Sequence, residues 1–368
     1  MDQQQPLKKI DNYVYDPLKP IGKGSFATVY QATNELDGTP AALKVIPTKL
    51  LLEDEEHYNL FVRELNVLRQ IQGDHIVGFF DVKRTQNNLY IVTEYCNDGD
   101  LEKRIKEKKP FTESEACSIL KQIANAFITV ENSSIMNEQQ QKVTIMHRDI
   151  KPANILFHNG RVKVADFGFA KVVEDVEKNT KKQHTPYMGT PLYMAPEILN
   201  DEDYSSKCDI WSTGMLFYQL LFGKLPWTGF SIPNLYTKIK KTPLDIPQTA
   251  SEDLKDLLNK MLKINEEERI SWRELYIHPA LQRIDISQIK PKSKEGSRLE
   301  NQDLPPQNAV SHNAFRSVKS EEFVDEKNSM PEDPTVVKNS SLLIWAALGL
   351  LLLLIFTKML SPNEKIEL

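Results

Sequence analysis

One polar run constrains what this chain can fold into more than any other feature. His147 to Asn154 reads HRDIKPAN, and the triplets Asp166-Phe167-Gly168 and Ala195-Pro196-Glu197 follow it in that order. Each triplet alone occurs in many unrelated proteins. Their ordered combination, on a chain whose N-terminal part reads as strands and whose C-terminal part reads as helices, is typical of a site that transfers a phosphoryl group.

The residue types in these motifs are those that phosphoryl transfer requires. A carboxylate must accept the proton of the attacking hydroxyl, and carboxylate or amide oxygens must hold Mg²⁺. Asp149, Asn154 and Asp166 supply these groups. Lys151 adds a cation near the transferred group, where negative charge has to be stabilised.

A glycine-rich turn lies near the N-terminus. Gly22 to Val29 reads GKGSFATV after a predicted strand, and glycine lets backbone N–H groups approach phosphate oxygens. A plain hairpin is the alternative interpretation. Ala27 stands where the usual pattern has its third glycine, and it is small enough for the loop to close. The nucleotide-binding residues predicted here are Ile21, Gly22, Lys23, Gly24, Ser25, Phe26, Ala27 and Val29.

Lys44 lies on an apolar strand predicted from Ala41 to Ile46. A buried Lys is costly unless a carboxylate pairs with it. Glu64, on a predicted amphipathic helix from Leu60 to Ile71, is the candidate partner, and Lys44 would then reach nucleotide phosphates. The alternative is that both side chains simply reach solvent.

Other elements follow from local patterns. Leu89 to Glu94 is predicted as a strand. Thr112, followed by acidic residues, is predicted as a helix N-cap. Asp209 to Phe222 and Ser251 to Ile264 are predicted as helices.

Composition excludes several classes of protein. The 368 residues are 40% hydrophobic and 26% charged, which is enough apolar material for a large core. The formal net charge of -5 argues against nucleic acid as a partner. The 3 cysteines are scattered, which argues against a disulfide framework and a zinc site and favours a reducing compartment. The N-terminus has no apolar signal-peptide region, so most of the chain is expected in the cytosol.

The chain divides by composition into five parts, which are predicted as follows. Residues 1–12 form a polar N-terminal segment, 13–281 a folded catalytic domain, 282–340 a disordered linker, 341–360 a transmembrane helix and 361–368 a short luminal tail.

Taken together, the motifs resemble those of eukaryotic protein kinases over residues 13–281. The resemblance implies an α+β, bilobal fold with a small β-rich N-lobe and a larger, mostly helical C-lobe. It implies that Lys44 pairs with Glu64 and binds ATP phosphates, that Asp149 is the catalytic base, and that Asn154 and Asp166 bind Mg²⁺. It also places Glu94 to Cys96 at the hinge facing adenine, with Asp100 at the ribose, Val29, Ala42 and Leu156 around adenine, and Thr93 at the gatekeeper position.

Two features of the resemblance favour Ser/Thr over Tyr substrates. Lys151 in the catalytic loop is the type found in Ser/Thr kinases, and Thr190 would hydrogen-bond toward Asp149 and Lys151. Asp209 is expected to be structural, as is Arg269, which should pair with Glu197. The alternatives are a pseudokinase scaffold, which all the key residues oppose, and a small-molecule kinase, which the segment from Gly189 to Glu197 opposes.

Finer segments are similar to the ULK family of autophagy-initiating kinases. They are IGKGSFATVY, EYCNDGDL, ADFGFAK and GTPLYMAPEIL. Phe169 is typical of that group and implies a preference for Ser over Thr in protein substrates. The resemblance implies a role in autophagy-type or organelle signalling.

Arg148 precedes the catalytic Asp149, and an Arg at this position commonly needs an anionic partner. A phosphorylated activation loop would supply one, with Thr185 favoured over Thr180 and Tyr187. An upstream kinase or autophosphorylation in trans would add the phosphate.

The run from Ser341 to Thr357 has no charged residue. Ser341 to Leu360 would form about 30 Å of helix, which matches the hydrocarbon core of a bilayer. We expect a tail anchor with the kinase in the cytosol. The final residues, Lys365-Ile366-Glu367-Leu368, resemble an ER-retrieval signal, so the ER is favoured and the mitochondrial outer membrane is the alternative.

Overall fold

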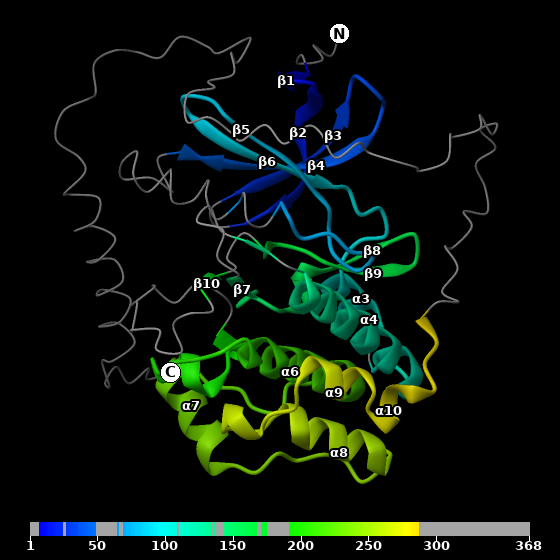
Figure 1. The fold of residues 1–368 in the computed structure, drawn as a ribbon, viewed down its shortest axis with the longest axis vertical. Helices are drawn as coiled ribbons and strands as arrows, with labels where there is room; N and C mark the ends of the chain where they lie inside the picture. Colours follow the sequence, from blue (N-terminus) through cyan, green and yellow to red (C-terminus); the bar gives the residue numbers. More distant parts are fainter. Residues whose placement is uncertain are drawn as a thin grey trace, which may run out of the picture. The chain divides into compact units, whose positions relative to one another are not determined.

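The computed structural model describes residues 7–24, 27–48, 65, 69–108, 110–133, 135–136, 143–167 and 191–286, and the backbone alone of 171–174. These residues form a β-rich N-terminal lobe above a mostly helical C-terminal lobe (Figure 1). The predicted α+β, bilobal architecture is therefore confirmed.

The N-terminal lobe is one sheet of six strands in the order β1-β2-β3-β4-β6-β5. Every neighbouring pair is antiparallel. The strands are β1 (Lys8–Ile10), β2 (Tyr13–Lys23), β3 (Thr28–Asn34), β4 (Pro40–Pro47), β5 (Phe79–Arg84) and β6 (Asn88–Glu94). The strands predicted from Ala41 to Ile46 and from Leu89 to Glu94 are thus both present, as β4 and β6.

The sheet curls so that its two edges meet. β1 and β5 are the opposite edge strands, yet Asp11 in the β1–β2 turn forms an ion pair of 2.8 Å with Lys83 on β5. Asp11 has φ of 50°, a left-handed conformation that Asp tolerates in tight hairpin turns. The sheet itself begins at Lys8, inside the segment predicted as a polar N-terminus.

One face of this sheet has a small apolar core of its own. It is separate from the main core and is built on β1, β2, β3, β4 and β6, from Ile10, Tyr13, Tyr15, Ala32, Ala41, Leu43, Tyr90 and Val92. Residues alternate between faces along a strand, so the neighbours Ala42 and Lys44 point to the other face. That other face is the one that carries the predicted nucleotide-binding residues.

The C-terminal lobe is built around buried helices. Its elements are α3 (Leu101–Glu107), α4 (Glu113–Asn132), β7 (Val143–Met146), η1 (Pro152–Asn154), β8 (Ile155–His158), β9 (Arg161–Val164), β10 (Lys171–Glu174), η3 (Pro191–Tyr193), α5 (Pro196–Leu199), α6 (Lys207–Phe222), α7 (Ile232–Lys241), α8 (Glu252–Met261), η4 (Glu266–Glu268), α9 (Trp272–Tyr276) and α10 (Pro279–Gln282). Phe127 of α4 stacks on Trp272 of α9 with ring centroids 4.3 Å apart, which joins two sides of this core.

The predicted helix ends agree well with the structure. Thr112 caps α4 through a reciprocal capping box with Glu115. The predicted helix from Asp209 is α6, which begins two residues earlier, and the one from Ser251 is α8, which Ser251 precedes and which ends at Met261.

Two predicted helices fall outside the described residues in whole or in part. Of the predicted helix from Leu60 to Ile71, the structure describes only Leu65 and residues 69–71. The predicted membrane segment 341–360 lies outside the described residues altogether. Within the part of the chain that the structure describes, no helix is both long and apolar enough to cross a bilayer.

Candidate active site

Four predicted nucleotide-binding residues share one face of the N-lobe sheet. Val29 on β3 lies opposite Lys44 on β4, and Ala42 on β4 lies opposite Thr93 on β6. Opposite residues in an antiparallel pair point to the same side, as do residues two apart on one strand. The register alone therefore places Val29, Ala42, Lys44 and Thr93 on a common surface.

The glycine-rich turn joins β2 to β3 at the end of this surface. Gly22 pairs with Val29 and Lys23 with Thr28, and the Gly24 N–H donates to the Ala27 carbonyl over 2.9 Å. The side chain of Ile21 is exposed and Ala27 packs against the main core. Ser25 and Phe26 lie outside the described residues.

The catalytic-loop motif forms a compact cluster around the buried carboxylate of Asp149. Lys151 Nζ donates to Asp149 Oδ1 at 3.0 Å and to Oδ2 at 2.8 Å. Asn154 Nδ2 donates to Asp149 Oδ2 at 2.9 Å and to its backbone carbonyl at 2.8 Å. The structure thus brings together three predicted site residues that lie within a few positions of one another in the chain.

The buried carboxylate of Asp209 on α6 fixes the backbone of the catalytic loop. Asp209 accepts hydrogen bonds from the backbone N–H groups of His147 and Arg148, both at 2.8 Å. Arg148 has φ of 63°, so a backbone conformation that costs free energy is stabilised by these two bonds. Burial raises the pKa of the Asp209 carboxyl, and the same two hydrogen bonds oppose that rise. Asp209 is structural, as predicted.

The ring of His147 links the catalytic loop to the strand that ends at Asp166. Its Nδ1 accepts from the Asp149 N–H at 3.3 Å, so Nε2 carries the proton and donates to the Ala165 carbonyl at 2.8 Å. Phe167 lies edge-on to this ring with centroids 4.7 Å apart. One hydrogen bond and one ring contact therefore join the loop to the start of the Asp166-Phe167-Gly168 motif.

A hairpin brings the two predicted metal ligands side by side. Asn154 immediately precedes β8 and Asp166 closely follows β9, while Ile155 pairs with Val164 across the hairpin. The Ala165 N–H also donates to the Asn154 carbonyl at 2.9 Å. Both ligands therefore lie at the same end of the hairpin.

The two lobes meet at an ion pair across this site. Lys44 Nζ from β4 lies 2.7 Å from Asp166 Oδ1, although 122 positions separate the two residues in the sequence. Asp166 has φ of 64°, so its backbone is in the left-handed region just after β9 ends. Glu64, the predicted partner of Lys44, lies outside the described residues, so that pairing stays a prediction.

The donor set fits Mg²⁺ held between Asn154 and Asp166. Because the Asn154 amide nitrogen is bound to Asp149, its oxygen remains as the group for a cation, and Asp166 supplies a carboxylate at the same end of the hairpin. Hard oxygen ligands of this kind suit Mg²⁺, which keeps several waters or phosphate oxygens as further ligands. Among the described residues no group of three or more His, Cys, Asp or Glu forms a metal-binding cluster.

The hinge residues connect the lobes beside this surface. Cys96 follows the end of β6 at Glu94, and its side chain is partly buried. Burial raises the pKa of the Cys96 thiol to about 12, and the nearby Glu94 adds to the rise. The thiol is therefore protonated at neutral pH.

Asp100, just before α3, lies against Leu156 on β8. The two residues form an isolated backbone bridge, which places them together. Asp100 also caps α3, because its Oδ1 accepts from the Lys103 N–H at 2.8 Å. The carboxylate predicted to contact ribose thus has a structural role as well.

Sequence reasoning missed one contact at the hinge. Lys163 on β9 donates to Glu94 Oε2 over 2.8 Å, and both side chains are largely buried. Alternation along Arg161-Val162-Lys163-Val164 predicts only an outward-facing Lys, and no local signal identifies a partner so far away in sequence.

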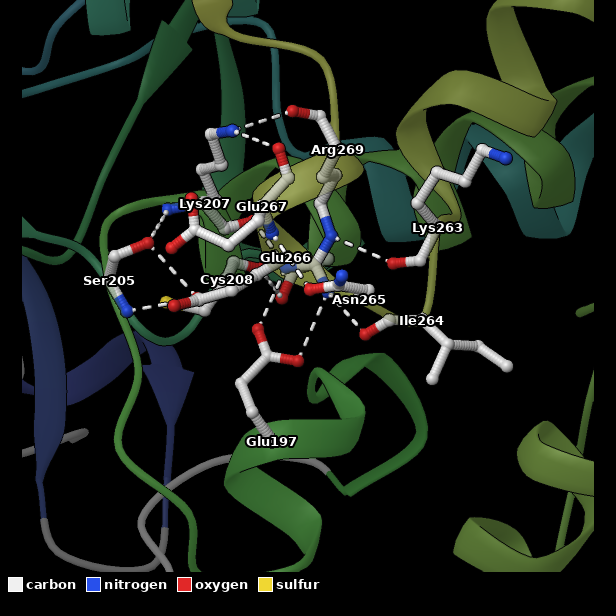
Figure 2. A network of polar contacts seen from close by, with 11 residues as sticks. Glu197, Ser205, Lys207, Cys208, Lys263, Ile264, Asn265, Glu266, Glu267 and Arg269 are labelled. Carbon is white, nitrogen blue, oxygen red and sulfur yellow. Dashed lines mark hydrogen bonds and ion pairs between the residues drawn. The ribbon is translucent and has the colours of Figure 1, made fainter.

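The predicted pairing of Arg269 with Glu197 is confirmed. Arg269 Nη1 and Nη2 lie 2.8 and 3.0 Å from the two carboxylate oxygens of Glu197, and Arg269 also donates to the carbonyls of Lys207, Lys263 and Ile264 (Figure 2). Beside them Glu266 accepts from the backbone and the hydroxyl of Ser205. This network fixes the Ala195-Pro196-Glu197 segment to the C-terminal lobe.

Thr190 and Thr185 lie outside the described residues, and their predicted roles stay predictions. Arg148 Nη1 donates to the Tyr204 hydroxyl at 3.3 Å. That contact positions the side chain predicted to meet a phosphate, close to the catalytic loop.

Fold and site together define a class of protein. The model of the protein kinase domain matches residues 15–281, and the chain belongs to that family. Every motif used above falls inside the matched range.

Several curated relatives are serine/threonine-protein kinases by name. Serine/threonine-protein kinase atg1 of Dictyostelium discoideum is 31% identical over 283 residues, which cover 74% of this chain and 39% of the relative. Serine/threonine-protein kinase ULK1 of Homo sapiens is 33% identical over 275 residues, covering 71% and 24%, and ATG1c of Arabidopsis thaliana is 31% identical over 336 residues, covering 87% and 43%. The chain therefore spans less than half the length of these relatives.

Proposed function

We propose that this chain is an ATP- and Mg²⁺-dependent Ser/Thr protein kinase similar to the ULK and Atg1 kinases. The observation that carries the proposal is the meeting of two groups from opposite lobes. Lys44 of the N-terminal lobe contacts Asp166, beside the cluster of Asp149, Lys151 and Asn154. Membership of the protein kinase family and the similarity to kinases named atg1 and ULK1 support the same function.

Each side chain has a distinct task in this proposal. Asp149 accepts the proton of the substrate hydroxyl, and Lys151, already bound to Asp149, stabilises negative charge on the transferred group. Lys44 binds and orients the nucleotide phosphates from above. Asn154 and Asp166 would hold Mg²⁺, which would supply positive charge to neutralise the phosphates.

Specificity and regulation belong to the same proposal. Serine is the preferred acceptor, which the resemblance at Phe169 supports, and phosphorylation at Thr185 by an upstream kinase or in trans places a phosphate near Arg148. The similarity to Atg1-type kinases supports a role in autophagy-type signalling.

The C-terminal run supports a membrane location. Its charge-free apolar stretch, together with the KIEL terminus, favours a tail anchor in the ER, with the mitochondrial outer membrane as the alternative. Imaging of the full chain beside a variant lacking residues 365–368 tests this: an unchanged location excludes retrieval through KIEL, and release into the supernatant on high-salt washing excludes the anchor.

The test of catalysis uses the full chain with Mg²⁺-ATP and a library of Ser, Thr and Tyr peptides, beside Asp149→Asn. We expect transfer to Ser peptides that falls at least about 100-fold in the variant, because a positioned general base contributes at least that much. Binding of ATP without transfer, in protein carrying a phosphate at Thr185, would instead indicate a membrane-bound pseudokinase scaffold.

A further inference from the structure

Lys163 joins the strand before Asp166 to the start of the hinge. Its Nζ donates to Glu94 Oε2 at 2.8 Å and to the Ile76 carbonyl at 3.2 Å. Only 13% of the Lys163 side chain and 21% of the Glu94 side chain is exposed, so this ion pair is far less screened than a surface pair. Breaking it would leave a charge with little access to water.

Glu94 is held on both its backbone and its side chain. Its N–H donates to the Gly78 carbonyl at 2.7 Å, and its Oε2 accepts from the Gly78 N–H at 3.0 Å as well as from Lys163. Among the residues that the structure describes, the carboxylate has two donors, and Lys163 is the charged one. Removing that charge weakens the restraint on the side chain and, through it, on the backbone that leads to Cys96.

The backbone around this pair ties the lobes together. The Val77 N–H donates to the Val164 carbonyl at 2.9 Å, and the Val164 N–H donates to the His75 carbonyl at 2.8 Å. Lys163 lies opposite Leu156 in the β8–β9 hairpin, so its side chain points to the same side as a predicted adenine contact. The ion pair thus lies where hinge, hairpin and predicted adenine site converge.

We propose that Lys163 is a positioning residue for the adenine ring: through Glu94 it fixes the hinge backbone that receives the base. The proposal rests on the proposed function, because it requires ATP at this cleft. Lys163 would also connect the hinge to the predicted metal site, because it contacts Glu94 and lies three residues before Asp166. A change at Lys163 acts on base recognition more than on phosphoryl transfer.

The test measures kcat and KM of the full chain with ATP and with GTP as phosphoryl donors. For Lys163→Met we expect KM for ATP to rise about tenfold. The hinge loses a hydrogen bond between charged groups, and such a bond changes an equilibrium constant by about a factor of ten or more. We expect kcat to stay within about twofold, KM for GTP to change little, and the preference for ATP over GTP to fall accordingly. Lys163→Arg keeps the charge and should retain most of that preference.

The matched control is Lys260→Met. Lys260 is an exposed Lys on α8 that also pairs with one carboxylate, Asp256, and its replacement should leave all four constants unchanged. If Lys163→Met fails to fold, Glu94→Gln is the replacement variant, because glutamine keeps the shape of the glutamate side chain and removes the ion pair. It should shift KM for ATP in the same direction by several-fold.

Equal changes in KM for ATP and GTP, or a loss of thermal stability with an unchanged ATP preference, would show that the pair is only structural and would overturn the proposal. A wild-type chain that binds no nucleotide would refute the proposed function and this inference with it. A wild-type chain that transfers phosphate while Lys163→Met keeps its full ATP preference would refute the inference alone.

Discussion

Replacement of Arg269 by Met should remove a large part of the stability of the C-terminal lobe. The Arg269 side chain is 0% exposed and that of Glu197 is 6% exposed. The variant leaves the carboxylate buried without its cation, and the carbonyls of Lys207 and Lys263 lose a donor as well. Breaking a buried pair in this way costs about 3–5 kcal/mol. For a domain of this size the corresponding shift in Tm is about 6–20 °C.

Equilibrium unfolding of the full chain in urea, followed by tryptophan fluorescence, measures this cost. Trp211 is a suitable probe, because it is fully buried and its ring centroid lies 5.3 Å from the Arg269 guanidinium carbon. Arg283→Met is the control, since Arg283 is exposed at the end of α10 and its loss should change the free energy of unfolding by at most about 0.5 kcal/mol.

The double variant Arg269→Met with Glu197→Gln separates the buried charge from the lost packing. Neutralising Glu197 should restore at least about 1 kcal/mol relative to Arg269→Met alone, because the uncompensated charge is then gone. A cost below about 1 kcal/mol for Arg269→Met, or strict additivity in the double variant, would refute this account of the pair.

Three further predictions concern separate parts of the chain. Gly229→Ala should destabilise by about 1–3 kcal/mol in urea unfolding, because a methyl group there would lie 2.6 Å from the backbone nitrogen of Leu235; an unchanged midpoint would contradict this. Cys96 should react with iodoacetamide at neutral pH far more slowly than an ordinary thiol, since a pKa of about 12 against 9.0 leaves about 1000-fold less thiolate; mass spectrometry of the peptide would reveal rapid labelling if the reasoning is wrong. The hydrogen bond from Lys108, and to a smaller extent those from Thr112, lower the pKa of Glu115 from 4.5 to about 2. The ionised Glu115 therefore stabilises the fold above pH 4.5, and this contribution disappears as the pH falls toward 2. The destabilisation caused by Glu115→Gln should shrink over the same range, and a destabilisation that does not depend on pH would exclude this linkage.

Local signals predicted much of what the structure shows. The capping box at Thr112 could be read from sequence because both of its partners lie within one helical turn. Asn154 and Asp166 were predicted as a pair of metal ligands from their motifs, and the structure adds the β8–β9 hairpin that brings their backbones to one end. Strand β1 carried a weaker signal, the Asp11-Asn12 turn, and its short, basic sequence obscured it.

Contacts between residues far apart in the sequence could be predicted only where both residues belong to a known motif. The Arg269–Glu197 pair could be predicted because both residues belong to recognisable motifs. Glu94 lies in the predicted hinge segment, but none of the quoted motifs includes Lys163, and only the folded lobes bring the two side chains together. The contact of Lys44 with Asp166 was not predicted either, since the expected partner of Lys44 was Glu64. Side-chain partners depend on packing, which a one-dimensional pattern does not contain.

The small apolar core on the N-lobe sheet determines where a stable recombinant fragment of this domain can begin. The family match starts at residue 15, but Ile10 and Tyr13, two members of that core, lie before it. A recombinant fragment that started at residue 15 would retain every catalytic motif and still uncover apolar side chains such as Leu43 and Val92. Such a fragment should aggregate or be digested by proteases more readily than one that starts at residue 7, so the limits of the family match and those of the folding unit differ here.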